Sequence, residues 1–152
     1  MKTIIAAVDF SNATPVILKM AIKFAKSFGA KLHLFHAVEQ EPSYSVYGFT
    51  PEEFPAMHVY QEEAVRRAKR QLDELRAEVK VELPECVCEV LEGSPVKSLL
   101  DYAKQNQADL VVLGTHGHGV LASLLLGSVV EGVVRKAAFP TLVVPVKAEA
   151  GV

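Results

Sequence analysis

The chain has 152 residues, of which 50% are hydrophobic and 22% are charged, and its formal net charge is −2. This length and composition predict one globular domain over residues 1–152 and exclude a disordered chain. The slightly negative charge argues against nucleic acid or an anionic membrane as a partner, because both favour basic surfaces.

The cysteines and the apolar segments indicate the compartment. Cys86 and Cys88 match neither a CxxC redox motif nor half of a zinc site, and their spacing on a strand points both to one face, so we expect packing thiols. A chain without a disulfide framework fits a reducing compartment. The first apolar run stops at Asp9, too early for a signal peptide, and the broken apolar stretch 120–134 is too short to span a bilayer. We therefore expect a cytoplasmic protein.

The first predicted element is a strand over residues 4–8, a continuous apolar run typical of a strand buried on both faces of a parallel sheet. An amphipathic helix follows, which Ser11 or Asn12 can cap and which Gly29 ends. Residues 32–38 are predicted to form the second strand.

The middle of the chain begins with a long connection over residues 39–57, rich in proline and aromatic residues. Loops of this length are often functional, so its aromatic side chains either cover a ligand or, as we expect, anchor the loop. A helical pattern returns over 58–80 and a third strand covers 87–91. The next helix is predicted to start at Pro95, with Ser94 at the N-cap.

A purely apolar strand over residues 110–113 ends at Gly114, a last helix runs to about residue 137, and a fifth strand covers 141–146. Strands that alternate with helices indicate crossover connections and a parallel sheet. With right-handed crossovers, the pattern predicts an α/β fold: an open, doubly wound, five-stranded parallel sheet with helices on both faces.

Ligands of such folds bind beyond the carboxyl ends of the strands, where the winding direction reverses. Two segments reach this edge: the end of the first strand, with Asp9, and the glycine-rich segment 114–129. Glycines let backbone N–H groups approach a phosphate, and the helix that starts near Gly127 and Ser128 favours an anion. Ser128 with Glu131 also matches a capping box, so a purely structural role for Ser128 stays open.

Other site motifs fit less well. A P-loop is excluded because no glycine is followed by lysine and Ser or Thr in the required register. Residues 117–122 read GxGxxA, but they follow the fourth strand, whereas the dinucleotide fingerprint follows the first. His116 and His118 lack a nearby carboxylate or thiol, so we expect no metal site there. His33 and His36 lie on opposite faces of a strand and cannot chelate together.

The spacing Gly114-x2-Gly117-x9-Gly127-Ser128, with Val129 following, resembles the ATP-binding signature of the universal stress protein family, G-x2-G-x9-G-(S/T). The likeness covers the whole chain, including the family's opening strand, its fourth-strand turn and its closing strand (residues 4–10, 113–117 and 139–145).

The resemblance implies an adenine-nucleotide α-hydrolase-like fold and a homodimer that pairs through the last strand. It also implies ATP, with Mg²⁺ or a similar cation, as the bound cofactor. Asp9 and the backbone near Ala37 would contact the adenosine, and Leu113 and Gly114 would lie close to the ribose and α-phosphate. The phosphates would be held by residues of the signature: Gly117, Gly127, Ser128 and Val129.

Three positions depart from the ATP-binding relatives: Ala7, where proline is common, and His118 and Gly119, where a basic residue and Thr or Ser are common. The expected function is a nucleotide-dependent stress-response or signalling module. A dimeric scaffold that does not bind ATP, and an adenylyl-transfer or dinucleotide-dependent enzyme, are the alternatives. Because no general base is poised beside a nucleophile, we expect no enzyme, beyond slow ATP hydrolysis or autophosphorylation.

Overall fold

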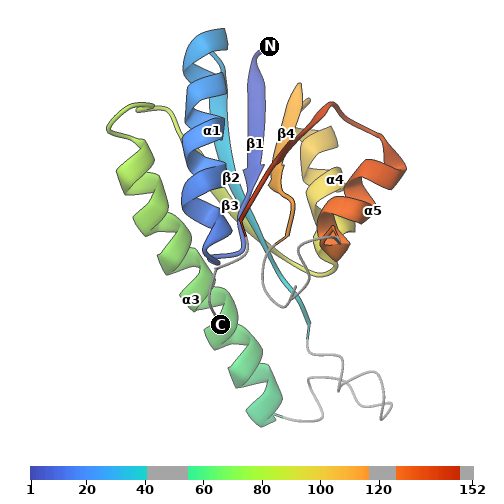
Figure 1. Ribbon diagram of the computed structural model, residues 1–152. Coiled ribbons are helices and arrows are strands. Elements are labelled where there is room, and N and C mark those ends of the chain that lie inside the picture. Colours follow the sequence, from blue (N-terminus) through green and yellow to red (C-terminus); the bar gives the residue numbers. More distant parts are fainter. Residues whose placement is uncertain (41–54, 117–125, 148–152) are drawn as a thin grey trace.

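A computed structural model describes residues 1–40, 55–116 and 126–147 (Figure 1). Strands and helices alternate along these residues in the predicted order. The elements are β1 (Thr3–Ala7), α1 (Ala13–Phe28), β2 (Lys31–Val38), α3 (Pro55–Val79), β3 (Val87–Glu92), α4 (Pro95–Gln105), β4 (Leu110–Gly114), α5 (Ser128–Lys136) and β5 (Thr141–Val144).

The five strands form one parallel sheet in the order β3-β2-β1-β4-β5. Ile4 of β1 pairs with Leu32 of β2 on one side and with Leu110 of β4 on the other. Helices α1 and α3 cover one face of the sheet, and α4 and α5 cover the opposite face (Figure 1). The predicted α/β fold with a doubly wound, five-stranded parallel sheet is therefore confirmed.

The strands are apolar throughout because both faces of the sheet are buried. Ile4 and Leu34 belong to the core beneath α1 and α3, whereas their neighbours Ile5 and Phe35 belong to the core beneath α4 and α5. All four side chains are at most 2% exposed. Successive side chains of a strand point to opposite faces, so a continuous apolar run supplies both cores at once.

The start of α1 is capped by Ser11. Its hydroxyl oxygen accepts a hydrogen bond from the N–H of Ala13 at 3.2 Å, while Asn12, at the N-cap position, makes no side-chain capping bond. The helix ends at Gly29, whose φ of 61° is the left-handed conformation that glycine adopts readily. Both predicted boundaries are confirmed.

Other boundaries differ slightly from the prediction. Ser94 and Pro95 occupy the predicted positions at the start of α4, but Ser94 makes no side-chain capping bond. Strand β5 ends at Val144, two residues short of the predicted end. Pro145 follows and has no N–H for the sheet ladder, which explains the early end.

Asp109 links the start of β1 to the start of β4. Its carboxylate accepts hydrogen bonds from the backbone N–H groups of Lys2 and Thr3, and these bonds lower its pKa. The first strand is thereby tied to the residue just before β4. Within the described residues, none of the helices combines the length and apolar character needed to cross a bilayer.

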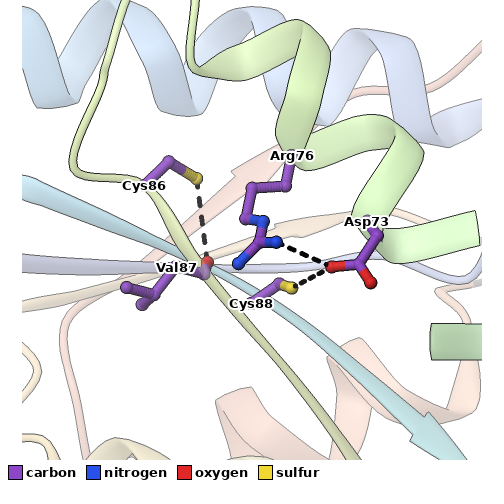
Figure 2. Close-up of polar contacts among 5 residues, drawn as sticks. All are labelled: Asp73, Arg76, Cys86, Val87 and Cys88. Atoms are coloured by element: carbon purple, nitrogen blue, oxygen red, sulfur yellow. Dashed lines mark hydrogen bonds and ion pairs between the residues drawn. The ribbon is translucent and has the colours of Figure 1, made fainter. Parts of the chain in front are cut away.

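Cys86 and Cys88 both contribute to the core beneath α3, on the same side of β3 (Figure 2). Cys88 donates a hydrogen bond from Sγ to Oδ1 of Asp73 at 3.4 Å, and Arg76 pairs with the same oxygen at 3.1 Å. Burial raises the pKa of Cys86 to about 11 and also raises that of Cys88. Neither residue is in a disulfide, and both are packing thiols as predicted.

Candidate functional site

A pocket of about 390 Å³ lies at the carboxyl edge of the sheet. Its walls are the ends of β1, β2 and β4 and the first turns of α1, α4 and α5. After β1 the chain continues to β2 on one side, whereas β4 and β5 lie on the other side, so the winding direction reverses between β1 and β4. Open α/β sheets bind ligands at this point.

The structure brings seven of the eight predicted site residues together around this pocket, and the eighth, Gly117, lies outside the described residues. The seven are Asp9, Ala37, Leu113, Gly114, Gly127, Ser128 and Val129. They come from three strand ends and one helix start, which are far apart in the sequence. Their grouping is an observation, and their contact with a nucleotide remains a prediction.

The first turn of α5 faces the pocket through Ser128, Val129 and Val130. The N–H groups of a helix's first turn have no acceptor within the helix, and the helix dipole makes this end positive. The N-cap residue of α5 is Gly127, which has no side chain with which to cap these N–H groups. Backbone donors are therefore available at one wall of the pocket.

The predicted capping box between Ser128 and Glu131 is wrong. Gly127 is the N-cap residue and Ser128 is already helical, so Ser128 stands one position too late to cap. Glu131 instead pairs with Arg135 at 2.6 Å, one helical turn further on.

Gly127 permits a close approach between two backbone segments. Its N–H donates to the carbonyl oxygen of Thr115 at 2.8 Å, and a Cβ at this position would stand 3.2 Å from Cα of His116. Gly114 is similarly confined, since its Cβ would stand 3.1 Å from a methyl group of Ile17 and 3.1 Å from one of Val146. Both glycines therefore allow neighbouring segments to pack closely, and the N–H of Gly127 is already hydrogen-bonded within the protein.

Asp9 has a local structural role. Its Oδ1 accepts a hydrogen bond from the N–H of Ser11 at 3.0 Å, while the residue also lines the pocket. Phe10 between them has a φ of 62°, and its ring centroid lies 4.5 Å from that of His36. Because Nδ1 of His36 lies 2.7 Å from the carbonyl oxygen of Val8, this nitrogen carries the proton and donates. The turn after β1 is thus fixed to the end of β2.

Some lining residues were not identified from the sequence as parts of the site: His36, Glu39, Pro95 and Leu99. The signal that points to them is topological. The end of β2 and the start of α4 lie beside the point where the winding direction reverses, so their residues become candidates once the strand order is known.

His33 and His36 lie on opposite faces of β2, as predicted. Nδ1 of His33 lies 2.9 Å from the hydroxyl of Tyr102 on α4, whereas His36 contacts the turn that leads into α1, so the two lie on opposite faces. Burial, with Lys31 nearby, lowers the pKa of His33. His118 lies outside the described residues, and within the described part of the chain no three potential ligands gather into a metal site.

Comparison with known proteins defines the class. The profile of the Universal stress protein family matches residues 1–145. The universal stress protein MJ0531 of Methanocaldococcus jannaschii is 31% identical over 145 residues, which cover 94% of this chain and 81% of that protein. A universal stress protein of Thermus aquaticus is 34% identical over 145 residues, covering 94% and 98%. The chain belongs to the universal stress protein family.

Solved structures show the same fold. The universal stress protein UspA from Lactobacillus plantarum superposes with a TM-score of 0.78 at 24% identity, covering 94% of this chain and 97% of that one. A universal stress protein in complex with cAMP has a TM-score of 0.60 at 24% identity and covers 94% and 95%. One from Archaeoglobus fulgidus in complex with dAMP has a TM-score of 0.59 at 21% identity and covers 95% and 98%.

Proposed function

We propose that this chain is an ATP-binding universal stress protein, a nucleotide-dependent stress-response or signalling module of the cytoplasm. The observation that carries the proposal is the pocket. Seven of the eight residues that the glycine signature and the flanking strands nominate line one cavity at the point where the winding reverses. Its volume of about 390 Å³ lies within the range of roughly 300–1,000 Å³ typical of small-molecule sites.

The orientation of the nucleotide follows from the chemistry of the walls. The phosphates would lie against the first turn of α5, where Ser128 and Val129 present backbone N–H groups and the positive end of the dipole. The adenosine would lie toward Asp9 and Ala37, with the ribose near Gly114. In this arrangement Gly127 makes room for the phosphates and donates nothing to them, because its N–H is bonded to Thr115.

Adenine nucleotides are supported by relatives in two complexes, one with cAMP and one with dAMP. ATP with Mg²⁺ is the more specific proposal. Mg²⁺ keeps several waters and is usually bound through substrate phosphates and one or two carboxylates. Ser128 provides a hydroxyl beside the proposed phosphates, so this hydroxyl, the phosphates and water would hold such an ion.

The proposed homodimer would form through β5. This strand lies at one edge of the described sheet, and its residues Thr141, Leu142 and Val143 are only half-buried. An edge strand offers its outer backbone groups to a second chain. Light scattering should give a dimer, and a monomer across micromolar concentrations would exclude this arrangement.

We propose a binding module rather than an enzyme. Thr115 and His116, beside the pocket, form a hydroxyl–imidazole pair at 3.2 Å. Thr115 is not among the described lining residues, and its hydroxyl contacts His116 and the N–H of Val146. Rapid, saturable turnover of ATP would contradict this part of the proposal.

A scaffold that acts without nucleotide is the second candidate, and the packing around Gly114 and Gly127 favours it, since both glycines have steric reasons to be there. The deciding experiment is to purify the protein without added nucleotide, denature it and identify released molecules by mass spectrometry. About one adenine nucleotide per chain would support the binding module. An empty protein that also fails to bind Mg-ATP by calorimetry would support the scaffold.

A further inference from the structure

Thr115, just after β4, joins three elements at the rim of the pocket. Its N–H donates to the carbonyl oxygen of Val144 at 3.0 Å, and its carbonyl oxygen accepts from the N–H of Gly127 at 2.8 Å. Its side-chain oxygen accepts from the N–H of Val146 at 3.0 Å. The end of β4 is therefore held to the end of β5 and to the start of α5 through one residue.

The same hydroxyl lies 3.2 Å from Nδ1 of His116. A threonine hydroxyl has one proton to donate and lone pairs that accept. Val146 donates to one lone pair of Oγ1, so the hydroxyl keeps its proton, which it can donate to Nδ1 of His116. A neutral imidazole that accepts at Nδ1 carries its proton on Nε2. A Thr115 hydroxyl that donates to Nδ1 would therefore fix the Nε2–H tautomer of His116.

His116 lines the pocket next to the start of α5. Its Cα is the atom that a side chain on Gly127 would meet first, at 3.2 Å, so its backbone lies directly against the N-cap of α5. Among the described residues, the bond to Thr115 is the one hydrogen bond of the His116 ring. With Nδ1 turned to Thr115, Nε2 is the ring nitrogen left to serve the pocket.

We propose that His116 is a ligand-binding residue of this site, which donates Nε2–H to a phosphate oxygen of the nucleotide held at the start of α5. Thr115 is a positioning residue that fixes the ring and its tautomer. The inference rests on the proposed function and extends it, because it adds a side-chain donor to the backbone donors of α5 and names the phosphate as the group that His116 recognises.

The test compares a ligand that has a phosphate with one that lacks it. Calorimetry with AMP and with adenosine is run on the wild-type protein, on His116→Leu and on His116→Gln, whose amide N–H lies near the place of Nε2–H. A hydrogen bond to a charged group contributes enough that its loss should weaken AMP binding by roughly tenfold or more. Adenosine binding should change by less than about threefold in His116→Leu, and His116→Gln should largely keep its affinity for AMP.

The positioning role has its own pair of variants. Thr115→Val removes the hydroxyl and should weaken AMP binding more than adenosine binding, whereas Thr115→Ser keeps the hydroxyl and should restore AMP affinity. Nitrogen-15 NMR of the ligand-free protein should show the proton of His116 on Nε2. This measurement stands even if the leucine variant fails to fold.

The outcomes separate the two proposals. If the wild-type protein binds neither Mg-ATP nor AMP nor adenosine, the nucleotide function fails and this inference fails with it. If the wild type binds both and folded His116→Leu binds AMP equally well, the role of His116 alone is overturned. A proton on Nδ1 of His116 in the ligand-free protein overturns the role of Thr115.

Discussion

Gly127→Val tests the proposed phosphate position directly. Gly127 has φ of −64° and ψ of 158°, an extended conformation that any residue adopts, so the substitution introduces no backbone strain of its own. Its new Cβ would stand 3.2 Å from Cα of His116 and 3.5 Å from the carbonyl oxygen of Thr115. Both are backbone atoms, so the contact is relieved only when the turn after β4 or the start of α5 moves.

The two expected effects differ in size. Overpacking of this kind costs about 1–3 kcal/mol of stability, which a domain of about 5–15 kcal/mol tolerates. A hydrogen bond from a backbone N–H to a phosphate oxygen contributes about 1.5–3 kcal/mol, so displacing one of them weakens binding by roughly 10- to 100-fold. Gly127→Ala adds only the Cβ and should fall between the wild type and Gly127→Val.

Calorimetry with Mg-ATP measures the affinity, and circular dichroism with thermal unfolding shows that the variant is folded. Gly132→Ala is the matched control, because its Cβ would stand 2.8 Å from a methyl group of Val96 and disturbs the contact of α5 with α4. Neither residue lines the pocket, so this control should keep its Mg-ATP affinity within about twofold while its Tm changes. Folded Gly127→Val with wild-type affinity for Mg-ATP would refute the placement of phosphates at the start of α5.

Three further predictions concern groups outside the pocket. The pKa of Asp109 is lowered in the folded protein, so its charged form stabilises the fold above the unfolded pKa. In urea unfolding, Asp109→Asn should therefore be less stable than the wild type at neutral pH, and this difference should disappear as the pH falls through the folded pKa. A difference in stability that persists below the folded pKa would contradict this role of Asp109. Cys86 has a pKa of about 11, against a usual 9.0, so near pH 8 its thiolate fraction is roughly 100-fold smaller than that of an ordinary cysteine. Iodoacetamide should therefore modify Cys86 far more slowly in the native protein than in urea, and equal rates measured by mass spectrometry would exclude the burial described here. Tyr102→Phe leaves Nδ1 of His33 buried without its hydrogen-bond partner and should lower the free energy of unfolding by about 1–3 kcal/mol. If the lost hydrogen bond is the cause, adding His33→Leu to this variant should recover part of that stability.

The fold was predictable because its main signals are local. The run Ile4–Val8 is apolar at every position because alternate side chains enter two different cores, and no amphipathic strand would show this pattern. Gly29 ends α1 where the sequence predicts, since its conformation is one that other residues adopt reluctantly. Asp9, Gly114 and Gly127 could be nominated for the site because glycine spacing and strand ends are visible in the chain itself.

The remaining details depend on contacts between distant segments. The capping box at Ser128 fails because the helix boundary differs by one residue, a difference that propensities do not resolve. The role of His116 depends on the hydroxyl of Thr115, and the orientation of that hydroxyl depends on Val146, 31 residues further along the chain. Spacing within the sequence does not encode such an arrangement; it arises when β5 pairs with β4.

The pocket described above has walls from β1, α1, β2, α4, β4 and α5, so no short part of the chain contains it. A molecule that binds there recognises the folded chain alone and shifts the folding equilibrium by mass action. At a free concentration 100 times its Kd, such a molecule adds about 2.7 kcal/mol to the free energy of unfolding. Resistance of the whole chain to heat and to proteases would then rise with the ligand supply, and the amount of folded protein in a cell would follow the concentration of that small molecule.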